Sequence, residues 1–342
     1  MSEILTIGEP IVTFASKEPD VSLRDALEFH KILGGAELNV AIGAQRLGHS
    51  VDYISQVGEE PLGDYVIKMI KEHHVGTRYI TRDADYWTAF QLKDRVTQGN
   101  PTTQNYRRGS AAAHLTPAVV DQIDLTDVRA AHMSGIFPAI SATAEAAFRT
   151  LLKRLEAANI LTTFDPNLRP TLWPSRDKMV TTLNELAGHA EIVLPGVEEG
   201  KILMGSTDPE KIADFYLRGA RTKVVIVKVG PAGAYVKQQS GESYTVTGFK
   251  VAQVADTVGA GDGFAMGVLT ALLEHKSLRS AVMRGNAVGA LQVQTYGDND
   301  GYPTPAGLQA FYQQEGVVED SWIYKLQLIG SRWIRRLTWL NS

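Results

Sequence analysis

The run from Asp256 to Phe264 combines a carboxylate with small residues at the start of a predicted helix. It reads Asp-Thr-Val-Gly-Ala-Gly-Asp-Gly-Phe, and a mostly apolar stretch, residues 265–273, follows. The backbone N–H groups of Gly259, Ala260 and Gly261 can point into one concavity because their side chains are so small. The helix adds its free N–H groups and the positive end of its dipole. This turn can stabilise negative charge, and Asp262 beside it can accept a proton from a hydroxyl group.

The same run could also have a purely structural role. The glycines could serve only as a turn between strand and helix, with Asp262 as a favourable charge at the helix start. The sequence contains no Gly-x-x-x-x-Gly-Lys-Ser/Thr motif and no Gly-x-Gly-x-x-Gly after a strand. Any nucleotide site must therefore be built in a different way.

Two polar segments each carry an arginine. Arg169 lies in the segment 165–173, directly after a predicted strand, and Arg107 lies in the segment 105–111. A guanidinium group offers a planar fork of donors that matches a carboxylate. Strand alternation places Asn105 and Arg107 on the same face. Two arginines from separate elements indicate an anionic substrate, although they could instead pair with surface carboxylates or with nucleotide phosphates.

The elements that must position these residues are short apolar runs that alternate with helical patterns. Strands of this kind joined by helices are typical of βαβ units, so we expect an α/β fold with a mainly parallel sheet flanked by helices. Ligands bind at the carboxyl ends of such strands, where the polar segments fall. The predicted strands are Ile4–Ile7, Val51–Val57, Ala130–Ser134, Ile160–Phe164, Ile192–Leu194 and Val224–Val229, and the predicted helices include Pro61–His73, Ala142–Ala158, Asp177–His189, Pro209–Arg218 and Gly261–Glu274.

Residues 9–33 and about 86–113 interrupt this alternation of strands and helices. Both segments contain short runs of alternating apolar and polar residues with no helical pattern between them. This alternation predicts half-exposed antiparallel strands, which we interpret as a small β-lid over the main domain. The alternative is a long surface hairpin without a function.

Composition excludes several classes of protein. The 342 residues include no cysteine, which excludes disulfide frameworks and thiolate metal sites. Net charge is −4 and the basic residues are dispersed, so we expect no nucleic-acid partner. The N-terminus has no signal-peptide pattern, and no apolar run approaches the ~18–20 residues of a membrane span. We expect a soluble, cytoplasmic protein without a membrane partner.

The tail, residues 316–342, differs from the rest of the chain. It contains Trp322, Trp333 and Trp339. Apolar residues spaced three or four apart predict an amphipathic helix there, and a non-native extension is the alternative.

The run from Asp256 to Phe264 resembles the C-terminal signature of the ribokinase-like, phosphofructokinase-B type carbohydrate kinases. A second signature of that family, a glycine pair followed by asparagine, is similar to Gly34-Gly35-Ala36-Glu37-Leu38-Asn39. The resemblance covers about residues 3–315 and implies one Rossmann-type kinase domain, 1–315, with the lid segments inserted. It also implies that Asp262 is the catalytic base and that the amides of Gly259, Ala260 and Gly261 form the anion hole. Met266 departs from the small residue usual in the family.

The resemblance extends to the nucleotide and its ions. It implies ATP and Mg²⁺, with a monovalent cation as a further candidate. Lys228, Gly230 and Gly233 match the strand end that lines the nucleotide, and Asn286 is similar to a residue near the adenine. Glu199 would orient magnesium through water, although Gly196 stands where the family usually has asparagine.

Within the family, the chain is most similar to 2-keto-3-deoxygluconate kinases. This implies ATP-dependent phosphorylation of the terminal hydroxyl of a small sugar acid, and a homo-oligomer formed through the lid. Gln91 and Asn105 stand at lid positions where these kinases often carry tyrosine. A fructose, ribose or nucleoside kinase, or a non-catalytic sugar- or nucleotide-binding regulatory protein, are the alternatives. The implied substrate contacts are Gly34, Gly35, Asn39, Gln91, Asn105, Arg107, Ile136, Arg169 and Asp298.

Overall fold

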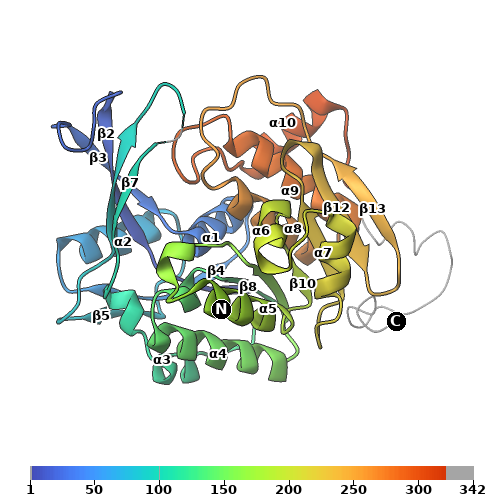
Figure 1. Ribbon diagram of the computed structural model, residues 1–342, viewed down its shortest axis with the longest axis horizontal. Coiled ribbons are helices and arrows are strands. Elements are labelled where there is room, and N and C mark those ends of the chain that lie inside the picture. The colour runs from blue at the N-terminus through green and yellow to red at the C-terminus, as the bar shows by residue number, and fades with distance from the viewer. Residues whose placement is uncertain (1, 100, 321–342) are drawn as a thin grey trace.

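The computed structural model describes residues 2–99 and 101–320. Within these residues a nine-stranded sheet has the order β13-β12-β11-β10-β9-β8-β1-β4-β5 (Figure 1). The strands from β11 to β5 are parallel, whereas β12 and β13 run antiparallel. The predicted α/β fold with a mainly parallel sheet is confirmed. Most of the predicted tail helix lies outside the described residues.

Where a strand or helix was predicted, the observed bounds agree closely with the predicted ones. The strands of the large sheet are β1 (Ile4–Ile7), β4 (Val51–Gly58), β5 (Ile80–Asp83), β8 (Ala130–Ser134), β9 (Leu161–Asp165), β10 (Ile192–Val193), β11 (Val224–Lys228), β12 (Gly233–Gln238) and β13 (Ser243–Thr247). The helices are α1 (Ala36–Arg46), α2 (Pro61–Glu72), α3 (Pro117–Asp121), α4 (Ala142–Ala157), α5 (Arg176–Ala187), α6 (Val197–Leu203), α7 (Pro209–Tyr216), α8 (Ala260–Leu273), α9 (Leu278–Gln292) and α10 (Pro305–Glu315).

Helices cover both faces of the large sheet, and strand alternation divides the core between them. In β1, for example, Ile4 packs on one side and Leu5 on the other. The first side is covered by α1, α2, α8, α9 and α10. The second is covered by α3, α4, α5, α6 and α7. The central strands of the sheet are therefore buried on both faces, which explains why they are mostly apolar along their whole length.

The segments 9–33 and 86–113 supply a second, smaller sheet of order β3-β2-β6-β7, which stands at the left of Figure 1. Its strands are β2 (Ile11–Pro19), β3 (Phe29–Gly34), β6 (Phe90–Arg95) and β7 (Thr103–Tyr106). The expectation of antiparallel pairing is wrong for one pair, because β2 and β6 are parallel. Between them the chain passes through the main body and re-enters the small sheet in the same direction.

The strands at the two edges of the large sheet, β5 on one side and the β12-β13 hairpin on the other, were not predicted. The hairpin of β12 and β13 extends the sheet beyond β11. Its signal was present in the sequence as alternating residues on either side of Gly241, whose φ of 93° suits a tight turn. The described residues contain no helix with the length and apolar character needed to span a bilayer.

Candidate active site

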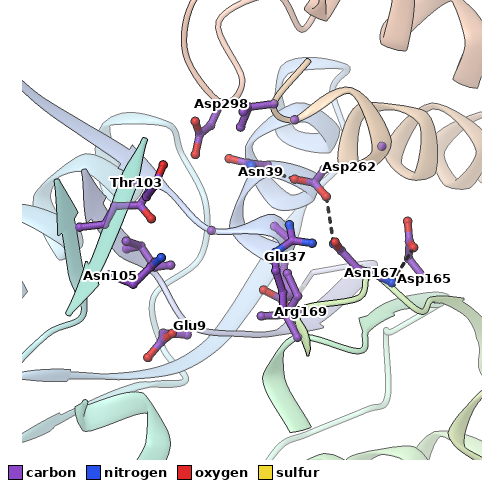
Figure 2. Close-up of a pocket in the computed structure, with 18 of the residues that line it drawn as sticks. Glu9, Glu37, Asn39, Thr103, Asn105, Asp165, Asn167, Arg169, Asp262 and Asp298 are labelled. Carbon is purple, nitrogen blue, oxygen red and sulfur yellow. Dashed lines mark hydrogen bonds between the residues drawn. The ribbon is translucent and has the colours of Figure 1, made fainter. Parts of the chain in front are cut away.

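A cavity of about 550 Å³ lies between the small sheet and the carboxyl ends of β9 and β11. Figure 2 shows Thr103 and Asn105 of the small sheet on one side of it and Asp262, Asn167 and Asp165 on the other. The structure thus brings most of the predicted site together. The predicted residues that line the cavity are Gly35, Asn39, Gln91, Asn105, Arg107, Ile136, Arg169, Glu199, Lys228, Gly259, Gly261, Asp262 and Asp298.

Asp262 lies in the first turn of α8 and its carboxylate faces the cavity. Its Oδ2 accepts a hydrogen bond of 2.9 Å from Nδ2 of Asn39, and its Oδ1 lies 3.5 Å from Nδ2 of Asn167 (Figure 2). The amide of Asn39 is itself oriented, because its Oδ1 accepts from Nδ2 of Asn299 at 3.0 Å. The carboxylate is therefore held in place by two amide groups from distant parts of the chain.

The surroundings of Asp262 shift its protonation equilibrium. The pKa of Asp262 is raised to about 6, mainly by burial and also by the nearby carboxylate of Asp165. The hydrogen bond from Asn39 and the charges of Arg169 and Lys228 act in the opposite direction. A carboxylate with a pKa near neutrality is a stronger base than a solvated one, yet is still ionised at pH 7.

The turn before α8 exposes backbone donors. Gly259 has φ 77°, and a Cβ there would come 1.8 Å from the carbonyl oxygen of Asp298, so only glycine fits. Among the described residues, the amides of Gly259 and Gly261 donate no hydrogen bond. The amide of Ala260 makes only a long bond of 3.4 Å to the carbonyl of Thr257. These donors, at the N-terminus of a long helix, can bind a phosphoryl group.

Three charged side chains lie beside this turn. Nζ of Lys228 is 2.5 Å from Oδ2 of Asp165, and a Cβ at Gly261 would lie 3.7 Å from the same ammonium group. Burial by itself would lower the pKa of Lys228, but the carboxylates of Asp165 and Glu199 outweigh it and raise that pKa. Lys228 is therefore a fixed cation next to the exposed amides.

Glu199 was predicted to orient magnesium. Its two carboxylate oxygens accept hydrogen bonds from the amides of Gly196 and Leu168, at 2.7 and 3.0 Å. Burial raises its pKa, as does Asp165. The described residues contain no cluster of three or more side chains arranged to bind a metal. Two carboxylates, Asp165 and Glu199, fit a Mg²⁺ ion that would be coordinated mainly by nucleotide phosphates and water.

The two predicted anion-binding arginines have different environments. The side chain of Arg169 is exposed to the cavity and donates only to the carbonyl of Leu168, at 2.8 Å, among the described residues. Arg107 is buried, and its Nε donates to Oε2 of Glu9 at 2.6 Å. Ser110 donates to the other oxygen of that carboxylate. The alternative of a carboxylate partner thus holds for Arg107, although the partner is buried rather than on the surface.

Close packing explains the glycine pair at the start of α1. Gly35 has φ 127°, and a Cβ there would come 2.7 Å from the carbonyl oxygen of Glu9. Gly34 is outside the cavity lining, yet a Cβ there would approach Oδ2 of Asp298. Burial raises the pKa of Asp298 to about 6, and Lys93 acts to lower it. Asp298 is therefore a further carboxylate that lines the cavity.

Three of the predicted nucleotide residues lie together, but outside the lining of this cavity. Gly230 and Gly233, with φ 59° and 104°, form the turn between β11 and β12. Nδ2 of Asn286 donates to the carbonyls of Val246 and Thr247, so this amide nitrogen supports the end of β13. Their predicted contact with a nucleotide remains a prediction.

Sequence reasoning missed several residues of the cavity. Glu9, Glu37, Lys93, Asn167 and Asp256 all line it. Glu37 is almost completely buried, Oε1 has no hydrogen-bond partner among the described residues, and burial raises its pKa to about 8. Three of them lay in polar segments or motifs that the sequence analysis singled out: Asn167 precedes Arg169 in a polar segment at a strand end, Asp256 begins the run before the predicted helix, and Glu37 follows the glycine pair.

Comparison with known proteins agrees with this geometry. Residues 1–305 match the family model described as pfkB family carbohydrate kinase. The chain is 40% identical over 317 residues to a 2-dehydro-3-deoxygluconokinase of Bacillus subtilis (strain 168), covering 92% of this chain and 97% of that protein. It is 32% identical to a probable chloroplastic fructokinase-6 of Arabidopsis thaliana, covering 88% and 80%. The crystal structure of a PfkB protein from Polaromonas sp. JS666 superposes with a TM-score of 0.82 at 41% identity, covering 91% of this chain and 100% of that one.

Proposed function

The chain belongs to the pfkB family of carbohydrate kinases and is an ATP-dependent sugar kinase, and we propose that it phosphorylates the terminal hydroxyl of 2-keto-3-deoxygluconate with Asp262 as general base. The observation that carries the mechanism is the position of the Asp262 carboxylate, one turn from exposed amides and inside the same cavity. A base and an anion-binding turn so close together can serve the attacking and the transferred group at once.

In the proposed reaction the sugar hydroxyl attacks ATP in line. A bond forms between its oxygen and the γ-phosphorus while its proton passes to the carboxylate of Asp262. The bond from that phosphorus to the bridging oxygen breaks, and this oxygen keeps the electron pair as ADP leaves. The amides of residues 259–261 and the ammonium of Lys228 stabilise the charge that develops on the transferred group. Bound Mg²⁺ would neutralise phosphate charge, with Asp165 and Glu199 facing it through water.

An anionic substrate is supported by Arg169. Its guanidinium lies at the cavity with a single hydrogen bond to a described residue, so it retains donors for a carboxylate. The relative from Bacillus subtilis is named for the same substrate. Asn39 and Asp298 contribute polar groups that could bind sugar hydroxyls. Gln91 is less free, because its Nε2 donates to Oγ1 of Thr13.

Fructose is the second candidate, and one observation favours it. The charge of Arg107 is neutralised by Glu9, which leaves less positive charge in the cavity than two free arginines would give. A fructokinase is also among the similar proteins.

A substrate panel tests the proposal. Purified protein with ATP and Mg²⁺ is assayed for ADP release with 2-keto-3-deoxygluconate, gluconate, fructose and ribose, and the phosphorylated product is identified by ³¹P NMR. We expect the highest kcat/KM with 2-keto-3-deoxygluconate. A higher value with fructose would overturn the substrate assignment, and no transfer to any sugar would overturn the mechanism.

Three further parts of the proposal rest on the sequence. The small sheet acts as a lid, the protein forms a homo-oligomer through it, and the compartment is the cytoplasm. The lid role agrees with the position of the small sheet along one side of the cavity (Figure 2). A closed lid would exclude water from the transferred phosphoryl group.

A further inference from the structure

An ion pair joins the small sheet to the turn that precedes the phosphate-binding amides. Nζ of Lys93, in β6, lies 2.8 Å from Oδ2 of Asp256. The side chains are only 14% and 11% exposed. A pair this well shielded from water interacts more strongly than one on the surface, where the median contribution is about 0–1 kcal/mol.

Asp256 has a second contact, and it connects the pair to the turn. Its other oxygen, Oδ1, accepts a hydrogen bond of 3.1 Å from the amide of Val258. The carbonyl of Val258 accepts from Nε2 of Gln292, and that of Gly259 accepts from the hydroxyl of Tyr302. Within the described part of the chain, three side chains therefore hold the backbone of the turn, and of these three Asp256 is the one bonded to the small sheet.

Lys93 also shares a face with the sugar-side residues of the small sheet. Gln91, two residues earlier in β6, lines the cavity, and Thr103, the neighbour of Lys93 in β7, lines it too. The Lys93 charge also acts on Asp298. A movement of the small sheet against a bound sugar would therefore move the ammonium that holds Asp256.

We propose that Lys93 is a positioning residue for phosphoryl transfer: through Asp256 it fixes the turn of residues 258–261 when the small sheet closes on the sugar. The proposal rests on the proposed role of that turn in phosphate binding. Coupling of this kind completes the anion-binding site only when sugar is enclosed, which limits transfer of the phosphoryl group to water.

The test is a double-mutant cycle with Lys93→Met, Asp256→Asn and the double variant. Lys93→Met removes the cation and keeps the length of the side chain. Asp256→Asn removes the charge but retains an oxygen acceptor for the Val258 amide. The control is Lys17→Met, because Lys17 is a lysine of the same sheet whose partner Glu28 lies 3.8 Å away and is exposed. Lys93→Arg restores the cation.

Each variant is assayed for ADP release and, separately, for sugar phosphate by ³¹P NMR, with the sugar that the wild type phosphorylates fastest. We expect both single variants to lose about 10- to 100-fold in kcat, because small misplacements in an active site have effects of this size. We also expect a larger fraction of ATP to be hydrolysed without sugar phosphate. The double variant should be no worse than the singles, and Lys93→Arg should recover most of the activity.

Three results would overturn the proposal. One is a wild-type kcat and product ratio in Lys93→Met. Another is a defect in Lys93→Met that Asp256→Asn does not share, because Lys93 would then act on the substrate directly. A lower melting temperature with unchanged kcat would likewise mean a merely structural pair. A wrong sugar assignment gives a different result, since it changes the preferred substrate of the wild type and not the ranking of the variants.

Discussion

Replacing Asp262 by asparagine should make the folded protein more stable at neutral pH, although it removes the proposed base. The pKa of Asp262 is about 6 in the folded state, against 3.8 for an aspartate free of such surroundings. The ionised carboxylate is thus less favourable in the fold than in the unfolded chain. The stability of the fold with a protonated Asp262 is therefore fully present below about pH 4 and is lost as the pH rises through about 6, where the carboxyl group ionises. Asparagine avoids this loss and can still accept the hydrogen bond from Asn39.

The size of the effect follows from the shift. About two pKa units at ~1.36 kcal/mol per unit give at most ~3 kcal/mol. The side chain is partly exposed to the cavity, so solvent reduces this and we expect about 1–2 kcal/mol. Urea unfolding without ATP or sugar, followed by circular dichroism at about pH 7.5 and about pH 4.5, measures the difference. The advantage of the variant should be clear at the higher pH and small at the lower one.

The control for this experiment is Asp177→Asn, which removes an exposed carboxylate from the first turn of α5. It should change the free energy of unfolding by less than ~0.5 kcal/mol at either pH. A lower stability of Asp262→Asn than of the wild type at about pH 7.5 would refute the reasoning. So would a gain in the free energy of unfolding that is the same at both pH values.

The other predictions concern catalysis. Arg169→Ala should raise KM for 2-keto-3-deoxygluconate about 10- to 100-fold, because a charge-assisted hydrogen bond contributes ~1.5–3 kcal/mol. An unchanged selectivity for this sugar over fructose would contradict a contact between Arg169 and the carboxylate of the substrate. Gly259→Ala should lower kcat at least about tenfold, since the new Cβ would come 1.8 Å from the Asp298 carbonyl; Gly241→Ala is the control, because Gly241 also has positive φ but no atom within 4 Å of that Cβ. The value of kcat/KM should fall about tenfold per pH unit below about pH 6, because a protonated Asp262 cannot accept the proton of the sugar hydroxyl. A kcat/KM that stays constant between about pH 5 and pH 8 would contradict this.

Much of the fold was predictable because it depends on local patterns. Strands such as β1 and β8 are buried on both faces, so continuous apolar runs mark them directly. A glycine pair and a Gly-Ala-Gly turn mark places where the backbone must approach other atoms closely. These two patterns identified Gly35, Gly259 and the neighbouring Asp262 as candidate site residues. That Asn39 and Asp262, 223 residues apart in the chain, belong to one site followed only from the resemblance of both motifs to one family, and the hydrogen bond between them was not predicted.

What escaped prediction depends on contacts between distant segments. Alternation within β2 and β6 reveals strands but not their relative direction, so the parallel pair was missed. Arg107 has a typical anion-binding residue type, but its partner Glu9 lies 98 residues earlier and nothing local marks the pair. The ion pair of Lys93 with Asp256 spans 163 residues and is hidden for the same reason.

The role of Asp262 is tested most directly by the turnover of Asp262→Asn, measured as sugar phosphate formed from ATP by the pure protein. We expect kcat to fall about 100- to 10,000-fold, the range typical of a lost general base. KM for the sugar should change little, because Asn39, Arg169 and Asp298 still line the cavity. A kcat within about threefold of the wild type would show that Asp262 does not accept the proton.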